Sequence, residues 1–242
     1  MRQPANIILV GASGTVGSRI DALAREDGGY EVIARIDTAR PHSTLRELAP
    51  KKCEILVDFS HSNAMDASIE VARQRKAALL AGTTGLHDTH LRALEELARS
   101  VPVLVAPNTA VGCVVLLEMV PKISRALGKN FSPSIVEWHR QGKVDAPSGT
   151  ARAFMIELEN AADRGSALGS RAVASVRAGG IFGEHLIRFD GPDETIELVH
   201  KAHSRDLFAR GALRAASWLV NQEPGSFTMA DVLGLRDESP SR

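Results

Sequence analysis

The stretch "NIILVGASGTVGSRI", from Asn6 to Ile20, decides the fold class. It begins with a short run rich in isoleucine and valine, which is typical of a strand buried on both faces. Glycines follow at Gly11, Gly14 and Gly17, and the apolar residues after them keep a helical spacing. A strand, a glycine-rich turn and a helix in this order are the context that a dinucleotide-binding fingerprint requires.

Each glycine of this turn has a physical role in that interpretation. Gly11 allows the tight turn, Gly14 lets backbone N–H groups approach a pyrophosphate, and Gly17 lets the helix pack close to the sheet. Thr15 and Val16 lie where the helix begins, and its N-terminus offers partial positive charge to phosphates. The alternative is an ordinary glycine-rich turn, but the flanking strand and helix favour a bound nucleotide.

An acidic residue supports the nucleotide interpretation. Asp37 ends the next strand-like run, "YEVIARID", 20 residues after Gly17, where a carboxylate accepts from ribose hydroxyls. This carboxylate favours NAD, because it repels the 2′-phosphate of NADP. Arg40 could pair with that phosphate, whereas Arg35 is expected to point away as an ordinary strand residue. We therefore expect NADH and/or NADPH, with NAD favoured and NADP tolerated.

Strand-like and helix-like segments alternate through the first 108 residues. The runs "CEILVDFS", "AALLAGTTG" and "VPVLVAPN" predict further strands, with helices near 63–75 and 87–99. This alternation indicates a parallel α/β sheet of the Rossmann type, whose ligands bind beyond the carboxyl ends of the strands. Each loop alone could be a plain turn, but together they extend the predicted cofactor site to Phe59, Gly82, Thr83, Thr84, Ala106 and Asn108, the last through the nicotinamide carboxamide.

The pattern changes after Asn108. The run "TAVGCVVLLEMVPKISRAL" predicts one long helix, with a bend expected near Pro121. A strand "SPSIVEWH", a helix "SGTARAFMIELENAADR" and several strands follow, and "GPDE" signals a hairpin between two of them. The run "DLFARGALRAASWLVNQ" predicts a last long helix. The chain is therefore expected to hold a second, α+β domain.

The stretch "EWHRQGKVDAPSGTA", Glu137 to Ala151, concentrates reactive groups. Taken alone, a histidine beside a tryptophan is more often packed or exposed than catalytic. Here it lies near two cations and a turn that opens a helix, whose amides form an anion site. A proton carrier between two such anion-binding groups suits a small dicarboxylate whose reduction needs a proton beside a hydride. The predicted contacts are His139, Arg140, Lys143, Ser148, Gly149 and Thr150.

Composition limits the classes of partner. Lysine plus arginine equals aspartate plus glutamate, 29 each, so no global basic field attracts nucleic acid or anionic lipid. No apolar run approaches the roughly 20 residues that span a bilayer, and no signal-peptide pattern precedes the first strand. Cys53 and Cys113 make no metal or redox spacing. We therefore expect a cytoplasmic protein with reduced thiols, no metal, no nucleic acid and no membrane.

The chain resembles the dihydrodipicolinate reductase (4-hydroxy-tetrahydrodipicolinate reductase) family of the diaminopimelate–lysine pathway. The resemblance runs from the first strand to the last helix, and its "KVDAPSGTA" piece is highly specific. The matching pieces are "VGASGTVG", "VDFS", "AGTTG", "APNTAVG", "EWHRQGKVDAPSGTA", "RAGGIFGEH" and "HKAHSRDLFARGAL".

The resemblance implies a Rossmann domain at 1–109 completed by 214–242, and a substrate-binding and tetramerisation domain at 110–213. It implies NAD(P)H-dependent reduction of 4-hydroxy-tetrahydrodipicolinate, with loss of water, to tetrahydrodipicolinate by a homotetramer. By position, His139 matches the family's proton donor and Lys143 its catalytic or substrate-binding lysine. Gly149 and Thr150 match residues that hold a substrate carboxylate.

Some positions depart from the family pattern. Arg140 replaces the second of two usual histidines, Thr15 replaces a frequent arginine, and Thr109 and Ala110 replace a usual Phe-Ser pair. These changes leave open a paralogue that reduces a different cyclic imine. A non-catalytic nucleotide sensor is a further alternative, but such a protein has no need of His139 and Lys143.

Overall fold

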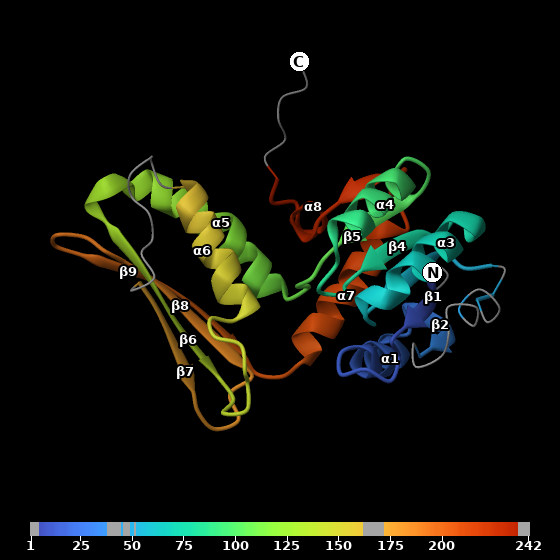
Figure 1. Cartoon of the computed structure of the whole chain (residues 1–242), viewed down its shortest axis with the longest axis horizontal. Helices are drawn as coiled ribbons and strands as arrows, with labels where there is room; N and C mark the ends of the chain where they lie inside the picture. The colour runs from blue at the N-terminus through green and yellow to red at the C-terminus, as the bar shows by residue number, and fades with distance from the viewer. Residues whose placement is uncertain (1–4, 38–44, 46–48, 51, 162–171, 237–242) are drawn as a thin grey trace, which may run out of the picture. The chain divides into compact units, whose positions relative to one another are not determined.

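The computed structural model describes residues 5–37, 45, 49–50, 52–161 and 172–236 (Figure 1). The chain forms two compact units, Met1–Val111 with Arg205–Arg242, and Gly112–Ser204. The second boundary therefore falls after Ser204, not after residue 213 as the sequence predicted. The reason is that helix α7 (Asp206–Leu219) is continuous and packs along its length on the first unit.

A six-stranded parallel sheet forms the centre of the first unit. Its order is β10-β5-β4-β3-β1-β2. Strand β2 lies on one side of β1 (Ala5–Val10) and β3 on the other, and β10, which is the last strand in the sequence, forms the edge beside β5. The predicted strands are confirmed, but β10, which is only 3 residues long and pairs with β5, carries no apolar run and was not predicted. The other strands are β2 (Tyr30–Ile36), β3 (Ile55–Asp58), β4 (Ala78–Ala81), β5 (Pro102–Val105) and β10 (Gly225–Phe227).

Helices cover both faces of this sheet, which explains why its inner strands are almost entirely apolar, whereas the edge strand β2 keeps the exposed Glu31 and Arg35. On one face, α3 (Met65–Arg75) and α4 (Asp88–Ala98) pack on alternate strand residues such as Ile8 and Leu79. The intervening residues, such as Leu9, are also fully buried and face α1 (Gly17–Asp27) and α7. A 3-10 turn η1 (Ser62–Ala64) precedes α3, and α8 (Met229–Leu233) is the last helix of the described residues.

The second unit is a mixed four-stranded sheet with two helices on one face (Figure 1). Its order is β7-β6-β8-β9, and only the β6–β7 pair is parallel. The strands are β6 (Ser132–His139), β7 (Val173–Arg177), β8 (Gly183–Asp190) and β9 (Thr195–Ala202). Helices α5 (Val111–Leu127) and α6 (Gly149–Ala161) bury Phe154 against Ile135 and Phe189, and a 3-10 turn η2 (Gly128–Asn130) follows α5.

Strand alternation gives this second sheet two different faces. Ile135, Glu137 and His139 point to the helix side and are buried, whereas the residues between them are only half-buried. The opposite face carries apolar side chains that remain accessible, with Val199 52% and Val176 36% exposed.

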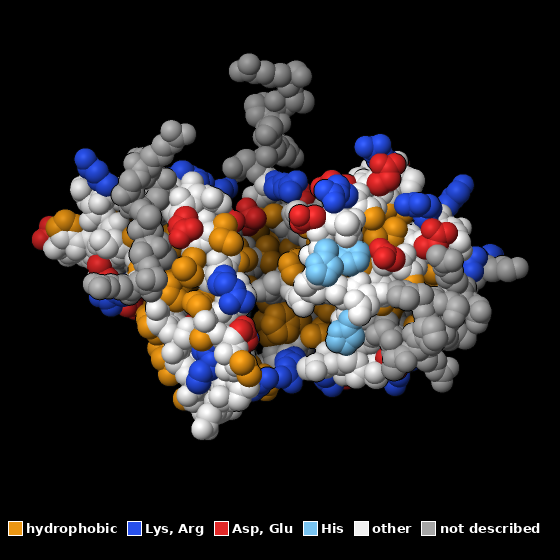
Figure 2. All heavy atoms as spheres, in the orientation of Figure 1, with side chains coloured by type: hydrophobic (Ala, Val, Ile, Leu, Met, Phe, Trp, Pro, Cys, Tyr) orange, Lys and Arg blue, Asp and Glu red, His pale blue; other side chains and the backbone are white. Residues whose placement is uncertain are grey.

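The surface carries charges of both signs. On the face shown in Figure 2, lysine and arginine side chains are interspersed with aspartate and glutamate, so neither charge dominates it. Among the described residues, no helix combines the length and the apolar character needed to cross a membrane.

Candidate active site

A cleft of about 670 Å³ lies in the first unit at the carboxyl ends of its strands, where the sequence placed a cofactor. The lining includes most of the predicted cofactor contacts and several residues that were not predicted. The predicted ones are Gly11, Gly14, Thr15, Val16, Asp37, Phe59, Gly82, Thr83 and Thr84, and the others are Ser13, Ser60, His61, Pro107, Thr109 and Phe208.

The glycine turn is shaped by close backbone approach. Gly11 has φ +82°, and a Cβ there would lie 2.6 Å from the Phe59 carbonyl oxygen. A Cβ at Gly17 would lie 2.0 Å from the Gly11 carbonyl oxygen, so Gly17 sets helix packing and does not line the cleft. Gly14 lines the cleft without a side chain, which leaves room for a phosphate group at the helix N-terminus. The residues present therefore fit a dinucleotide.

Asp37 holds the glycine turn in place. Its Oδ1 accepts a hydrogen bond from the Ser13 amide at 2.8 Å, and the residue lines the cleft. Arg35 points away and pairs with Asp21 at 2.6 Å, as predicted. Arg40, the predicted partner for a 2′-phosphate, lies outside the described residues.

A buried carboxylate that the sequence analysis missed connects the loops beneath the cleft. Asp58 has no exposed surface. Its Oδ1 accepts from the Ser60 hydroxyl at 2.5 Å and the Thr83 hydroxyl at 2.9 Å, and its Oδ2 accepts from the Ser68 hydroxyl at 2.6 Å. An aspartate ending the apolar run "EILVD" was the available signal. These bonds fix the loops after β3 and β4 relative to each other.

The loop after β5 is held by local hydrogen bonds. Ala106 is buried and its amide donates to the Ala81 carbonyl, while the Asn108 side chain accepts from the Ala110 amide at 2.9 Å. Neither residue lines the cleft. Thr109 does, and its hydroxyl donates to the Phe208 carbonyl at 2.7 Å. Local hydrogen bonds use the Ala106 amide and an Asn108 side-chain oxygen, and the contact of both residues with the cofactor stays a prediction.

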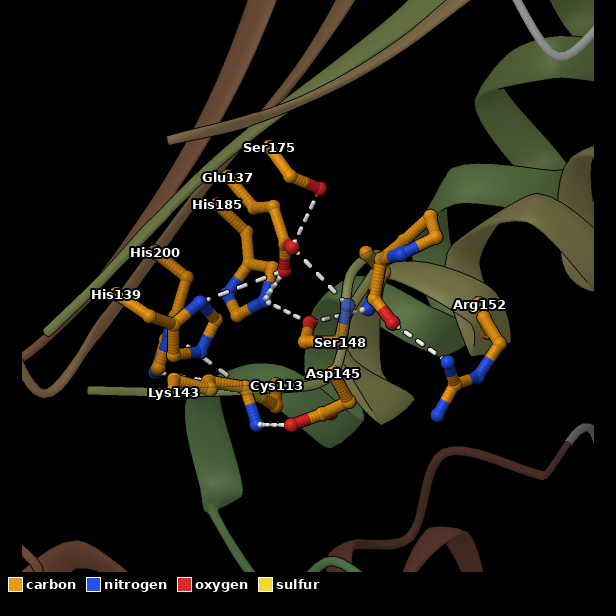
Figure 3. A network of polar contacts seen from close by, with 12 residues as sticks. Cys113, Glu137, His139, Lys143, Asp145, Ser148, Arg152, Ser175, His185 and His200 are labelled. Carbon is orange, nitrogen blue, oxygen red and sulfur yellow. Dashed lines mark hydrogen bonds and ion pairs between the residues drawn. The ribbon is translucent and has the colours of Figure 1, made fainter. Parts of the chain in front are cut away.

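The second unit holds a polar cluster centred on Glu137, which the sequence analysis did not single out (Figure 3). Strand register creates it: Glu137 is paired with His185 on β8, and His185 is paired with His200 on β9. His139 follows Glu137 by two residues and so shares its face. All four side chains therefore lie on the helix-covered side of the sheet.

Glu137 is fully buried and strongly hydrogen-bonded. Its Oε1 accepts from the Ser148 amide at 3.0 Å, the Ser175 hydroxyl at 2.7 Å and the Arg177 guanidinium at 2.9 Å. Burial alone would raise the pKa of this carboxyl, but the hydrogen bonds from Ser148, Arg177 and Ser175 outweigh it and lower the pKa to about 2. Glu137 is therefore a permanent negative charge inside the cluster at neutral pH.

Two imidazoles face this carboxylate. The Oε2 atom of Glu137 lies 3.4 Å from His139 Nδ1 and 3.8 Å from His185 Nε2, and the two rings meet edge to face. Burial lowers the pKa of His139 below its usual value, although Glu137 acts in the opposite direction. Burial, helped by the neighbouring His139, His200 and Lys143, lowers the pKa of His185 to about 4. Both rings are therefore neutral at pH 7 in the chain without ligand.

The loop between β6 and α6 carries Lys143 and is attached to β7 by one arginine. Lys143 Nζ pairs with Asp145 Oδ1 at 2.7 Å, and this contact lowers the pKa of the Asp145 carboxyl. Arg177 donates to the carbonyls of Lys143 and Asp145 at 3.3 and 2.5 Å, in addition to its bond with Glu137. Asp145 therefore shapes the loop, and Lys143 remains partly accessible to a ligand.

The turn that opens α6 offers fewer amides than predicted. The Ser148 amide already donates to Glu137, and the Ser148 hydroxyl accepts from the Ala151 amide at 3.1 Å and contacts His185 Nε2 at 3.2 Å. The Ser148 amide is therefore used inside the chain, and a substrate contact at Ser148 stays a prediction. Gly149 is exposed and remains a proposed anion contact with Thr150, and Arg140 is exposed on the same loop.

His200 extends the cluster towards α5. Its ring lies 3.4 Å from the Cys113 sulfur, and a Cβ at Gly112 would lie 2.9 Å from that ring. Glu137, His139 and His185 also offer three metal-ligand atoms within 4.8 Å of one another. Arg177 also bonds Glu137 Oε1 and Ser148 contacts His185 Nε2, and we assign no metal to these three residues.

Comparison with known proteins places the chain among its relatives. The sequence profile described as "Dihydrodipicolinate reductase, N-terminus" matches residues 5–109, and the one described as "Dihydrodipicolinate reductase, C-terminus" matches residues 112–233. The chain belongs to the dihydrodipicolinate reductase family. The family predicted from the sequence motifs is therefore confirmed.

Relatives within the dihydrodipicolinate reductase family match over almost their whole length. The 4-hydroxy-tetrahydrodipicolinate reductase of Stenotrophomonas maltophilia (strain K279a) is 39% identical over 95% of this chain and 98% of its own. That of Alkaliphilus metalliredigens (strain QYMF) is 33% identical over 95% and 99%. A solved dipicolinate-bound dihydrodipicolinate reductase from Paenisporosarcina sp. TG-14 has a TM-score of 0.74 at 18% identity, covering 94% of this chain and 98% of its own. This likeness confirms the predicted fold class.

Proposed function

We propose that this protein reduces 4-hydroxy-tetrahydrodipicolinate to tetrahydrodipicolinate with NADH or NADPH, in diaminopimelate and lysine biosynthesis. The observation that carries the proposal is the buried Glu137–His139 pair on the strand that leads into Lys143 and the α6 N-terminus. It supplies a proton carrier and anion-binding groups in a chain whose other unit has a dinucleotide cleft.

The cofactor belongs to the cleft of the first unit. Gly11, Gly14 and the N-terminus of α1 would hold the pyrophosphate, and Asp37 would accept from the ribose hydroxyls. When bound, the nicotinamide supplies the hydride for the reduction. One oxygen of Asp37 is used by Ser13, so the other is the proposed ribose acceptor.

The second unit holds the substrate and provides the proton. Lys143 and the turn at Gly149 and Thr150 are the proposed contacts for the two carboxylates. A dianionic substrate beside His139 raises the pKa of the imidazole, because the positively charged form is then stabilised. His139 therefore takes up a proton as substrate binds and delivers it during the reduction, while the hydroxyl group of the substrate leaves as water.

Arg140 is the position where the family pattern is broken. Its exposed guanidinium keeps a positive charge where a second histidine is usual, so we propose that it binds a substrate carboxylate. If its longer reach selects another ring, the protein reduces a different cyclic imine with the same groups.

We also propose that the protein works as a homo-oligomer, with a tetramer expected, in the cytoplasm. The support for assembly is the accessible face of the second sheet, where Val176 and Val199 are exposed and Val176 is paired with the half-buried Trp138. A partly apolar sheet face of this kind gains stability by packing on a second copy.

Steady-state kinetics with freshly generated substrate test the reduction. His139→Gln is expected to lower kcat by about 10²–10⁴-fold, the contribution of positioned acid–base catalysis, while NADH affinity stays the same. Lys143→Ala is expected to raise KM and lower kcat. His203→Gln, an exposed histidine outside the cluster, serves as the control and should match the wild type.

The possible outcomes separate the alternatives. NAD(P)H binding without turnover of any imine would identify a nucleotide sensor and refute the enzyme. Turnover of another cyclic imine, but not of 4-hydroxy-tetrahydrodipicolinate, would identify a paralogue. Near-normal kcat in His139→Gln would remove His139 from the chemistry.

A further inference from the structure

We propose that Glu137 is a positioning residue that orients the His139 imidazole for proton transfer. The inference rests on the proposed function, because it concerns the residue that delivers the proton. Nothing in the sequence motifs had assigned a role to Glu137.

The geometry leaves Glu137 and His139 as partners for each other. Glu137 Oε2 and His139 Nδ1 lie 3.4 Å apart, and both atoms are buried. Within the described part of the chain, neither atom has a hydrogen-bond partner, and Oε2 also lies 3.8 Å from His185 Nε2. The three donors to Glu137 all bind Oε1, from Ser148, Ser175 and Arg177. Those bonds fix the carboxylate plane, so Oε2 is held towards the imidazole.

This contact selects one tautomer of the imidazole. A carboxylate at Nδ1 favours the proton on that nitrogen, which leaves Nε2 as the atom that takes up and delivers the catalytic proton. Gly183 leaves space beside Nε2, since a Cβ at Gly183 would lie 3.0 Å from this atom. Glu137 therefore determines both the orientation of the ring and the nitrogen that reacts.

The charges around His139 show why the carboxylate is needed. Burial, Lys143 and Arg177 disfavour the imidazolium, and His185 packs against the ring edge. Glu137 and, more weakly, Asp145 favour it. Without the carboxylate, two cations and a buried site would keep the imidazole neutral even with substrate bound.

The same carboxylate reaches the proposed substrate turn. Its bond to the Ser148 amide attaches the first turn of α6 to the strand that carries His139. One group therefore fixes the proton carrier and the anion-binding turn in a single arrangement. A purely structural role would involve the Oε1 bonds alone, so the contribution of Oε2 is the quantity to measure.

The test compares Glu137→Gln with Ser175→Ala, which removes one donor to Oε1 and keeps the carboxylate charge. Histidine titration by NMR in the protein without substrate reports the pKa of His139 independently of turnover. We expect Glu137→Gln to lower this pKa by about one or more, the usual effect of losing an adjacent opposite charge, and Ser175→Ala to change it little.

Kinetics supply the second readout. A protonated donor is active at low pH and loses activity as pH rises through its pKa, so Glu137→Gln should move the high-pH limb of kcat to lower pH. At pH 7 we expect kcat to fall about 10–100-fold, because above its pKa a donor is about ten times less protonated for every pH unit by which that pKa falls. KM and NADH affinity should change little, and Ser175→Ala should keep the limb in place.

The wild-type tautomer gives a test that does not depend on any variant folding. Nitrogen chemical shifts of His139 should show the proton on Nδ1, and a proton on Nε2 would overturn the proposal. A folded Glu137→Gln protein with an unchanged His139 pKa and an unchanged pH limb would also overturn it. If wild-type protein fails to reduce the substrate while the NMR results hold, the proposed function fails and the Glu137–His139 pair stands.

Discussion

Replacement of Gly17 by alanine tests the packing that shapes the cofactor cleft. The added Cβ would lie 2.0 Å from the Gly11 carbonyl oxygen and 2.8 Å from its carbon. Non-bonded carbon atoms normally lie at least about 3.5 Å from their neighbours, so either helix α1 or the glycine turn must move by more than an ångström. Both are backbone, so no side-chain rotation can relieve the contact.

The expected cost follows from this overlap. Because backbone meets backbone, the cost lies at the upper end of overpacking, about 2–3 kcal/mol, and the better helix propensity of alanine returns about 1 kcal/mol. We therefore expect a net loss of about 1–2 kcal/mol in the free energy of unfolding. Gly11 also accepts a hydrogen bond from the Gly14 amide at 3.0 Å, so the displacement passes to a residue that lines the cleft. NADH affinity should fall about tenfold as a result.

Urea unfolding and calorimetric titration with NADH measure the two effects. Gly14→Ala is the matched variant, because its Cβ would lie 3.0 Å from the same oxygen, so it should lose affinity with less loss of stability. Gly180→Ala is the control, since no atom lies within 4 Å of its Cβ, and it should change neither quantity. Unchanged stability in Gly17→Ala, or unchanged NADH affinity in Gly14→Ala, would refute this reasoning.

Three other perturbations follow from the structure. Asp37→Ala should raise the KM for NADH more than the KM for NADPH; equal changes would mean that Asp37 only holds the Ser13 amide. Glu137 has a pKa of about 2 against an ordinary 4.5, so it stabilises the folded state above pH 4.5. That contribution, about 3 kcal/mol, is lost as pH falls from 4.5 towards 2, and urea unfolding should therefore show a steeper acid decline in wild type than in Glu137→Gln. Trp138→Glu should shift the homo-oligomer towards monomer in sedimentation; an unchanged assembly would place the interface elsewhere.

The sequence was sufficient for the features that depend on local order along the chain. The strand before Gly11 and the helix after Gly17 predicted the dinucleotide turn, and a fixed spacing placed Asp37 at its rim. Buried parallel strands predicted the sheet, because such strands must be apolar at every position. The three-residue strand β10 had no such pattern, since it only completes an edge beside β5.

Only part of the candidate site could be predicted from the sequence, because the rest depends on which strands pair. His139 and Lys143 stand in one short segment, whereas His185 and His200 join them only through the register of β8 and β9. Glu137 could have been found, because a residue two before His139 on a strand must share its face. An aspartate at the end of an apolar run marked Asp58, but its hydrogen-bond partners depend on which loops meet at the sheet edge, and neighbouring residues in the sequence do not give that.

The division of the chain has a consequence for its biosynthesis. The first unit is interrupted by Gly112–Ser204 and needs Arg205 onward to complete its sheet and cover one face with α7. During translation, the second unit is therefore completely synthesised before the C-terminal segment of the first unit. Until α7 emerges from the ribosome, the strand residues that it covers stay exposed, so the first unit cannot complete its core before the end of the chain is made.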